Sequence, residues 1–222
     1  CAGHVSRIRE SGDYFLFEAA GESLIVVRGR DGRVHALWNS CRHRGSRVCS
    51  LPSGNAKRLI CPDHQWAYDK DGSLLKARRM PDDFDRKDHG LKKLKVATRH
   101  GAMFATEAED IEPLETYLGD KMLKLFDRVF NGKPLRILGV SRQRIPANWK
   151  LMFENIKDPY HASLLHVFLV TFGLFRADNP SRTEMDSTGR HSALVSRRST
   201  NLAPNAATQE MGSFHEKLEL HD

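Results

Sequence analysis

Two short motifs of cysteine and histidine constrain the fold of this sequence more than any other feature. The first, C-R-H, runs from Cys41 to His43, and the second, C-P-D-H, runs from Cys61 to His64 after a gap of seventeen residues. Both motifs lie between segments that have the composition of β-strands, so we expect them in loops that can approach each other. Because thiolates and imidazoles bind soft and borderline metals, the pattern predicts a metal centre.

The first hundred residues have the pattern of a small antiparallel sheet or barrel. Short β-rich runs alternate with turn signals such as Asp31-Gly32, which favours a tight hairpin. The runs expected to form strands cover residues 3–8, 14–17, 23–28, 34–38, 58–60, 66–68, 74–75, 94–98 and 103–105.

Two kinds of metal centre use two cysteines and two histidines. Zinc fingers usually place their two histidines together at the far end of the motif. Here each motif supplies one cysteine and one histidine, as in a Rieske [2Fe–2S] cluster, where one iron binds two thiolates and the other binds two imidazoles. The spacing favours a Rieske cluster, with a zinc-stabilised binding module as the alternative.

A second group of metal-capable side chains lies on an expected helix that starts after Asn148, a suitable N-cap. Asp158 and His161 are three residues apart and share a helical face. His161 and His166 are five apart, which separates them by about 140° around a straight helix. Both bind one metal only if the helix breaks or bends near residues 159–165, where Pro159 favours a break. Taken alone, this stretch also fits a solvated helix with incidental histidines.

Between the cysteine–histidine motifs and the stretch after Asn148, the sequence pattern predicts a helix followed by a strand. Apolar residues recur at helical spacing within residues 113–134, which end in the helix-terminating sequence N-G-K-P. Residues 135–145 alternate enough to predict a strand. We expect further strands at 190–198 and 213–220, and a pocket wall at 167–175.

With these motifs, the chain resembles the Rieske non-haem iron oxygenases, specifically the large (α) subunit of aromatic-ring-hydroxylating oxygenases. The resemblance implies an α+β fold that begins with an antiparallel β Rieske [2Fe–2S] domain at residues 1–112. A linker helix at 113–134 is followed by the first part of a helix-grip type catalytic domain with mononuclear iron, truncated, at 135–222. Because the chain starts at Cys1 without a methionine, we also expect a fragment or a processed form.

The resemblance assigns the [2Fe–2S] ligands to Cys41, His43, Cys61 and His64. Respiratory Rieske proteins carry a further disulfide-forming cysteine pair in these loops, and Ser46 and Asp63 stand at those positions here. With fewer rigidifying groups around the sulfurs, we expect a lower reduction potential.

For the mononuclear Fe(II), the resemblance implies that His161 and His166 are two ligands of a two-histidine, one-carboxylate triad. Asp158 is expected to orient His161 and to bridge electrons from a Rieske histidine of a neighbouring subunit. Glu154 and Asn155 are expected to support the site, or, for Glu154, to lie on a solvated face. No carboxylate of this chain matches the third ligand.

The implied function is that of a terminal oxygenase, which receives electrons from NAD(P)H through a reductase and a ferredoxin and inserts oxygen from O₂ into its substrate. Residues 126–182 are similar to large subunits acting on anthranilate and salicylate, so an aromatic carboxylic acid is the expected substrate. Residues 1–100 look closer to relatives that N-demethylate quaternary amines such as betaines, which is the enzymatic alternative; a non-catalytic Rieske electron carrier is another. The expected partners are further copies of the chain, as a trimer of α subunits, and a small β subunit.

Charge and composition limit other functions. The chain has 35 Lys and Arg against 28 Asp and Glu, a net charge of +7, but it lacks a long basic run or interleaved aromatic residues, so we expect no nucleic-acid partner. No apolar stretch reaches the roughly 18 residues of a membrane span, so we expect a cytoplasmic protein without a membrane partner. Arg42, Arg44 and Arg47 crowd the first motif, where they either dock an acidic ferredoxin or are solvated.

Overall fold

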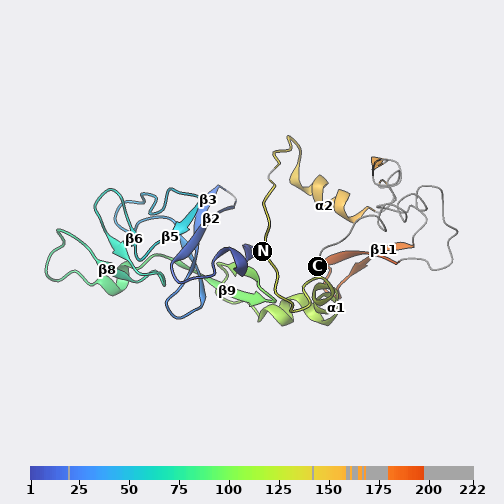
Figure 1. Ribbon diagram of the computed structural model, residues 1–222, viewed down its shortest axis with the longest axis horizontal. Helices are drawn as coiled ribbons and strands as arrows, with labels where there is room; N and C mark the ends of the chain where they lie inside the picture. Colours follow the sequence, from blue (N-terminus) through green and yellow to red (C-terminus); the bar gives the residue numbers. More distant parts are fainter. Residues whose placement is uncertain are drawn as a thin grey trace, which may run out of the picture. The chain divides into compact units, whose positions relative to one another are not determined.

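The computed structural model describes residues 1–19, 21–141, 143–158, 161, 165, 166, 168 and 180–197. The chain divides into two compact units. The first unit comprises Cys1–Leu114 and Asp127–Ser141, and the second comprises Glu115–Phe126 and Arg142–Asp222. Figure 1 shows the elements of each unit along the chain.

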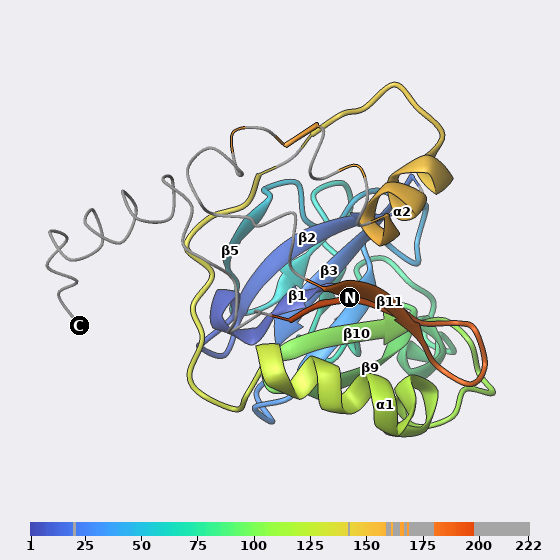
Figure 2. The ribbon, with the colours of Figure 1, turned by 90° about the vertical axis from the view of Figure 1, so that its right-hand side faces the viewer.

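The first unit is built on an antiparallel sheet of seven strands, in the order β1-β10-β9-β4-β3-β2-β5. Figure 2 shows β10 and β9 side by side, as their register requires. The predicted antiparallel β domain is therefore confirmed. The strands are β1 (Gly3–His4), β2 (Asp13–Ala19), β3 (Glu22–Arg28), β4 (Val34–Trp38), β5 (Ser53–Asn55), β9 (Lys93–Arg99) and β10 (Ala102–Thr106).

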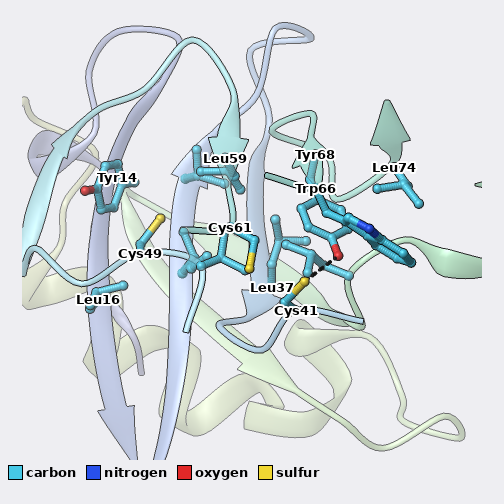
Figure 3. Close-up of a cluster of buried hydrophobic side chains, with 14 residues drawn as sticks. Tyr14, Leu16, Leu37, Cys41, Cys49, Leu59, Cys61, Trp66, Tyr68 and Leu74 are labelled. Carbon is cyan, nitrogen blue, oxygen red and sulfur yellow. Dashed lines mark hydrogen bonds between the residues drawn. The ribbon is translucent and has the colours of Figure 1, made fainter. Parts of the chain in front are cut away.

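Both faces of β3 are buried, because its apolar residues alternate between two core clusters. Ile25 and Val27 pack in the larger cluster, whereas Val26 packs in the smaller one. The larger cluster, shown in Figure 3, also contains Cys41 and Cys61. The metal-binding motifs therefore rest directly on the hydrophobic core.

A second sheet of three short strands carries the second motif. Its antiparallel strands are β6 (Leu59–Ile60), β7 (Ala67–Tyr68) and β8 (Leu74–Lys76), in chain order. The second motif forms the connection between β6 and β7, and the first motif lies between β4 and β5 of the larger sheet. The two motifs therefore come from different sheets.

Three local features of the first unit differ from the sequence prediction. The strand predicted at 3–8 is wrong beyond His4, because Val5–Arg7 forms a short 3₁₀ helix (η1) capped by the His4 side chain, which accepts from the Ser6 N–H. The sequence did not predict β5, whose three residues are exposed and polar or glycine and which pairs with β2 through its backbone. Nor did it predict the 3₁₀ helix η2 (Arg86–His89).

The predicted linker helix is present as α1 (Leu114–Val129). Gly119 interrupts it with a left-handed backbone conformation, φ 71°, which glycine adopts without the steric cost of a Cβ. The helical spacing of the apolar residues therefore predicted the helix correctly, and Gly119 kinks it.

In the second unit, α2 (Trp149–Lys157) starts where the sequence predicts. The Asn148 side chain accepts a hydrogen bond from the Lys150 N–H (3.0 Å), which confirms its role as N-cap. The strands β11 (Ser181–Met185) and β12 (Ser192–Ser196) form an antiparallel pair, so the strand predicted at 190–198 is confirmed.

The strand predicted at 135–145 is wrong in the residues that the structure describes there, 135–141 and 143–145. These residues are exposed, up to 94% at Leu138, and the Ile137 N–H donates to the Ser6 hydroxyl (3.1 Å) instead of to a strand. Alternation alone does not make a strand when no neighbouring strand pairs with it. The elements predicted at 213–220 and, apart from Phe168, at 167–175 lie outside the described residues. Among the described residues, no helix is long and apolar enough to cross a membrane.

Candidate metal centres

The two motifs form loops with the same backbone hydrogen bonds. The Cys41 N–H donates to the carbonyl five residues later (2.9 Å), and the N–H four residues later donates back to the Cys41 carbonyl (2.8 Å). The second loop repeats both bonds at Cys61, at 2.9 and 3.1 Å. Each loop turns through one left-handed residue, Gly45 (φ 78°) or Gln65 (φ 58°). The loops thus present their cysteines and histidines from equivalent backbone positions.

The two loop thiols are buried and lie next to each other. Cys41 and Cys61 are 3% and 1% exposed, and their side chains interact. Burial raises the pKa of Cys61 first of all, and the neighbouring Cys41 raises it further. Because an isolated thiolate is costly in this core, the pair favours a cation that neutralises both sulfurs.

A buried tyrosine from β7 contacts the first of these thiols. The Tyr68 hydroxyl accepts a hydrogen bond from the Arg42 N–H (3.1 Å) and lies 3.2 Å from Cys41 Sγ, as Figure 3 shows. Burial raises the pKa of Tyr68 well above its usual value, so the hydroxyl keeps its proton. Since a metal-bound thiolate only accepts, Tyr68 donates to Cys41 when this sulfur is a ligand. Sequence reasoning missed this contact, because the only signal was a tyrosine on a predicted strand.

The two imidazoles of the motifs also meet. The rings of His43 and His64 lie edge to face with centroids 4.4 Å apart, and His43 stacks on Trp66 at 5.1 Å. Burial, followed by the charges of His64 and Arg44, lowers the pKa of His43, which favours the neutral form that binds metals. His43 Nδ1 is buried and has no hydrogen-bond partner among the described residues. Such an orphaned nitrogen is costly unless a ligand engages it, so these four residues fit a [2Fe–2S] cluster.

Asn39, which sequence reasoning missed, stabilises the first loop through side-chain hydrogen bonds. It is 3% exposed, and its Oδ1 accepts from the N–H groups of Val48 (3.0 Å) and Cys49 (2.8 Å). Its Nδ2 donates to the Cys49 carbonyl (2.7 Å) and to the Ser23 hydroxyl (3.2 Å). Asn39 therefore fixes the chain that leaves the first loop. The only sequence signal was an amide residue two positions before the motif.

Other side chains of the first loop have structural or surface positions. Cys49 is buried, and burial raises the pKa of its thiol to about 11, in keeping with a packing role. Arg42 and Arg44 are exposed, whereas Arg47 forms an ion pair with Glu18 (3.5 Å).

The predicted iron-binding histidines lie just beyond α2. This helix ends at Lys157, directly before the segment where the sequence predicts a break. His161 Nδ1 is 3.2 Å from Asp158 Oδ2, and the rings of His161 and His166 have centroids 5.1 Å apart. Because an ionised carboxylate only accepts, Nδ1 carries the proton and Nε2 keeps the lone pair that binds a metal. Of the residues between the two histidines, 162–164 lie outside the described part of the chain.

The structure does not place the remaining predicted site residues against these histidines. Glu154 is 73% exposed at its side chain and pairs with Lys157 (3.7 Å), and Asn155 is also exposed. Within the described ranges, no three Cys, His, Asp or Glu side chains converge closely enough to hold a single metal ion. The apolar residues of α2 are exposed too, for example Trp149 at 66%.

Comparison with known families identifies two domains, which together cover most of the chain. Residues 1–98 match the Rieske [2Fe–2S] domain, and residues 120–221 match the catalytic domain of the ring-hydroxylating α subunits. The chain belongs to the Rieske ring-hydroxylating oxygenase α subunits. For a Rieske α subunit the cofactors are a [2Fe–2S] cluster and a mononuclear iron. The zinc alternative for the two cysteine- and histidine-bearing loops is therefore set aside.

Two curated Rieske oxygenases are similar to nearly the whole chain. The large oxygenase component of salicylate 5-hydroxylase from Ralstonia sp is 46% identical over 233 residues, covering 99% of this chain and 55% of that protein. The large subunit of anthranilate 1,2-dioxygenase from Burkholderia cepacia is 40% identical over 228 residues, covering 98% and 54%. The chain thus spans about half the length of the curated Rieske oxygenases it matches.

The fold is similar to that of solved Rieske oxygenases. Naphthalene 1,2-dioxygenase from Rhodococcus sp., solved with bound indole, superimposes with a TM-score of 0.80 at 27% identity, covering 96% of this chain and 52% of that one.

Proposed function

We propose that this α subunit takes electrons through a Rieske cluster to a mononuclear iron and inserts oxygen from O₂ into an aromatic carboxylic acid of the salicylate or anthranilate kind. The observation that carries the proposal is the meeting of two buried thiols and two imidazoles on equivalent loops, with one buried imidazole nitrogen unpartnered in the described structure. The substrate class rests on the two curated relatives that share nearly the whole chain.

The proposed cluster site uses Cys41 and Cys61 for one iron and His43 and His64 for the other. A bound cluster supplies one-electron transfer. The chain itself supplies the buried hydrophobic surroundings of the two sulfurs, the Tyr68 hydrogen bond to Cys41, and Trp66 stacked on His43. His64 is exposed, which suits a group through which electrons leave or enter the loop region.

The proposed iron site uses His161 and His166. A bound Fe(II) supplies O₂ activation. Asp158 holds His161 Nδ1–H, which would leave Nε2 as the atom available to bind iron, and we assign it also as the electron bridge to a Rieske histidine of a neighbouring subunit. Glu154 and Asn155 are assigned supporting roles near the iron. The third, carboxylate ligand is assigned to no residue of this chain.

We further propose the domain limits 1–112 for the Rieske domain, 113–134 for the linker helix and 135–222 for the beginning of the catalytic domain. The proposed partners are further α subunits, as a trimer, a small β subunit, and a ferredoxin and reductase that carry electrons from NAD(P)H. The exposed Arg42 and Arg44 suit an acidic electron donor.

Metal analysis of the purified full-length α subunit tests the two metal sites. We expect iron and acid-labile sulfide in equal amounts from the cluster, and further iron that His161→Ala or His166→Ala removes while the cluster spectrum stays. His43→Ala or His64→Ala should remove the cluster spectrum instead. Iron only in the cluster, insensitive to His161→Ala, would establish the electron-carrier alternative, and a colourless zinc protein would overturn both.

Turnover tests the substrate class. The oxygenase, supplied with a ferredoxin and an NADH-linked reductase, is given salicylate, anthranilate or glycine betaine, and NADH oxidation is compared with the hydroxylated or demethylated product. We expect product from an aromatic acid. Product from the betaine alone would contradict the proposed substrate class and support quaternary-amine demethylation.

A further inference from the structure

Ser46 and Asp63 join the two loops that carry the proposed cluster ligands. The Ser46 hydroxyl donates a hydrogen bond to Asp63 Oδ2, from one loop to the other. Ser46 stands where the first loop closes, since its carbonyl accepts the Cys41 N–H (2.9 Å). Asp63 directly precedes His64 in the second loop. A bond to an ionised carboxylate is charge-assisted and stronger than a bond between neutral groups.

The position of this bond matters because the two loops leave different sheets. The first loop follows β4 of the seven-stranded sheet, and the second lies between β6 and β7 of the three-stranded sheet, so in the described structure no strand ladder holds one loop against the other. A Rieske cluster needs one thiolate and one imidazole from each loop, so it is retained only while the loops keep their separation.

The inner and outer parts of the two loops are held differently. At the buried side, Tyr68 ties the second sheet to Cys41, and the thiols lie in the larger hydrophobic cluster. At the outer side, His64 and Asp63 are exposed and lack such packing. The Ser46–Asp63 bond lies on this outer side, next to the two histidines.

We propose that Ser46 and Asp63 form a latch that keeps the outer ends of the two loops together and thereby retains the cluster. The inference rests on the proposed cluster site formed by Cys41, His43, Cys61 and His64. When the latch is broken, the histidine ends of the loops separate more often, and water or a chelator reaches the iron held by the imidazoles. The buried thiol end is unaffected. Ser46 and Asp63 are thus positioning residues, not ligands.

The rate of cluster loss tests the latch. The chain is purified with its cluster, mixed with an iron chelator under argon, and followed by the decay of its visible absorption. Ser46→Ala and Asp63→Ala should each lose the cluster about five- to tenfold faster than the wild type, the size expected for a charge-assisted hydrogen bond that is weakened by exposure to solvent. Ser46→Thr, which keeps the hydroxyl, should behave like the wild type.

A matched control lies in the same loop. The Ser40 hydroxyl donates to the Gly45 carbonyl (3.3 Å) within the first loop, so Ser40→Ala removes a serine hydroxyl without touching the second loop. We expect its rate to stay within about twofold of the wild type. The Ser46→Ala/Asp63→Ala double variant should lose the cluster no faster than the faster single variant, because one bond is broken only once.

The results separate the latch from the cluster assignment. Unchanged rates in Ser46→Ala and Asp63→Ala, or multiplying effects in the double variant, would overturn the latch while the wild type still holds equal iron and sulfide. A wild-type chain without iron and sulfide would instead overturn the proposed cluster site.

Discussion

Replacing Tyr68 with phenylalanine removes one hydrogen bond from a proposed cluster sulfur and leaves the ring in place. The hydroxyl lies 3.2 Å from Cys41 Sγ, and the Arg42 N–H on its other side leaves its proton free for the sulfur. Reduction adds negative charge to the ligand sulfurs, so a donor to sulfur stabilises the reduced cluster more than the oxidised one. Tyr68→Phe should therefore lower the reduction potential.

The size of the effect follows from the strength of such bonds. A hydrogen bond to a charged group contributes about 1.5–3 kcal/mol, and only the difference between the two redox states changes the potential. If about half of the lower value is redox-dependent, the change is roughly 0.8 kcal/mol, or about 35 mV for one electron, at 59 mV per tenfold change in the equilibrium constant.

A redox titration followed by the electron paramagnetic resonance of the reduced cluster measures this shift. Tyr14→Phe is the matched control, because Tyr14 lies in the same hydrophobic cluster but away from Cys41, as Figure 3 shows. We expect its potential to equal that of the wild type. An unchanged or higher potential in Tyr68→Phe, or the same decrease in Tyr14→Phe, would refute the reasoning.

Two further substitutions test how the first loop is held. Asn39→Ala leaves the Val48 and Cys49 N–H groups buried without their acceptor, so it should lower the free energy of unfolding by about 2–4 kcal/mol in urea titrations, while Asn55→Ala on exposed β5 should cost less than about 1 kcal/mol. Gly45→Ala should cost about 1–2 kcal/mol through backbone strain at φ 78°, since its new Cβ would meet only Ser40 Oγ at 3.8 Å. Equal stability of Gly45→Ala and the wild type would show that the left-handed turn is not strained by a side chain.

The sequence predicted the parts of the site that depend on residue type and spacing. The two motifs indicated loops between strands, and the structure confirms loops with matching hydrogen bonds that start at Cys41 and Cys61. The N-cap at Asn148 was predictable because capping uses one side chain and the next few residues of the chain. Such local rules need no knowledge of the rest of the fold.

The contacts that hold the site were not predictable, because they join residues far apart in the sequence. Tyr68 reaches Cys41 across 27 positions, and Ser46 reaches Asp63 across 17. The strand expected at 135–145 failed for a related reason, since a strand needs a pairing partner that alternation within the segment does not reveal. Partner choice is a property of the folded chain.

The Tyr68–Cys41 and Ser46–Asp63 contacts stabilise opposite ends of the two loops. Tyr68 and the hydrophobic cluster fix the thiol end, where water is excluded and a hydrogen bond to sulfur raises the reduction potential. Ser46 and Asp63 act at the histidine end, where His64 is exposed to solvent and therefore to a redox partner. Tyr68→Phe should then change the potential more than the rate of cluster loss, and Ser46→Ala should change the rate more than the potential. The two substitutions together therefore tell whether retention and tuning are separate properties of this site.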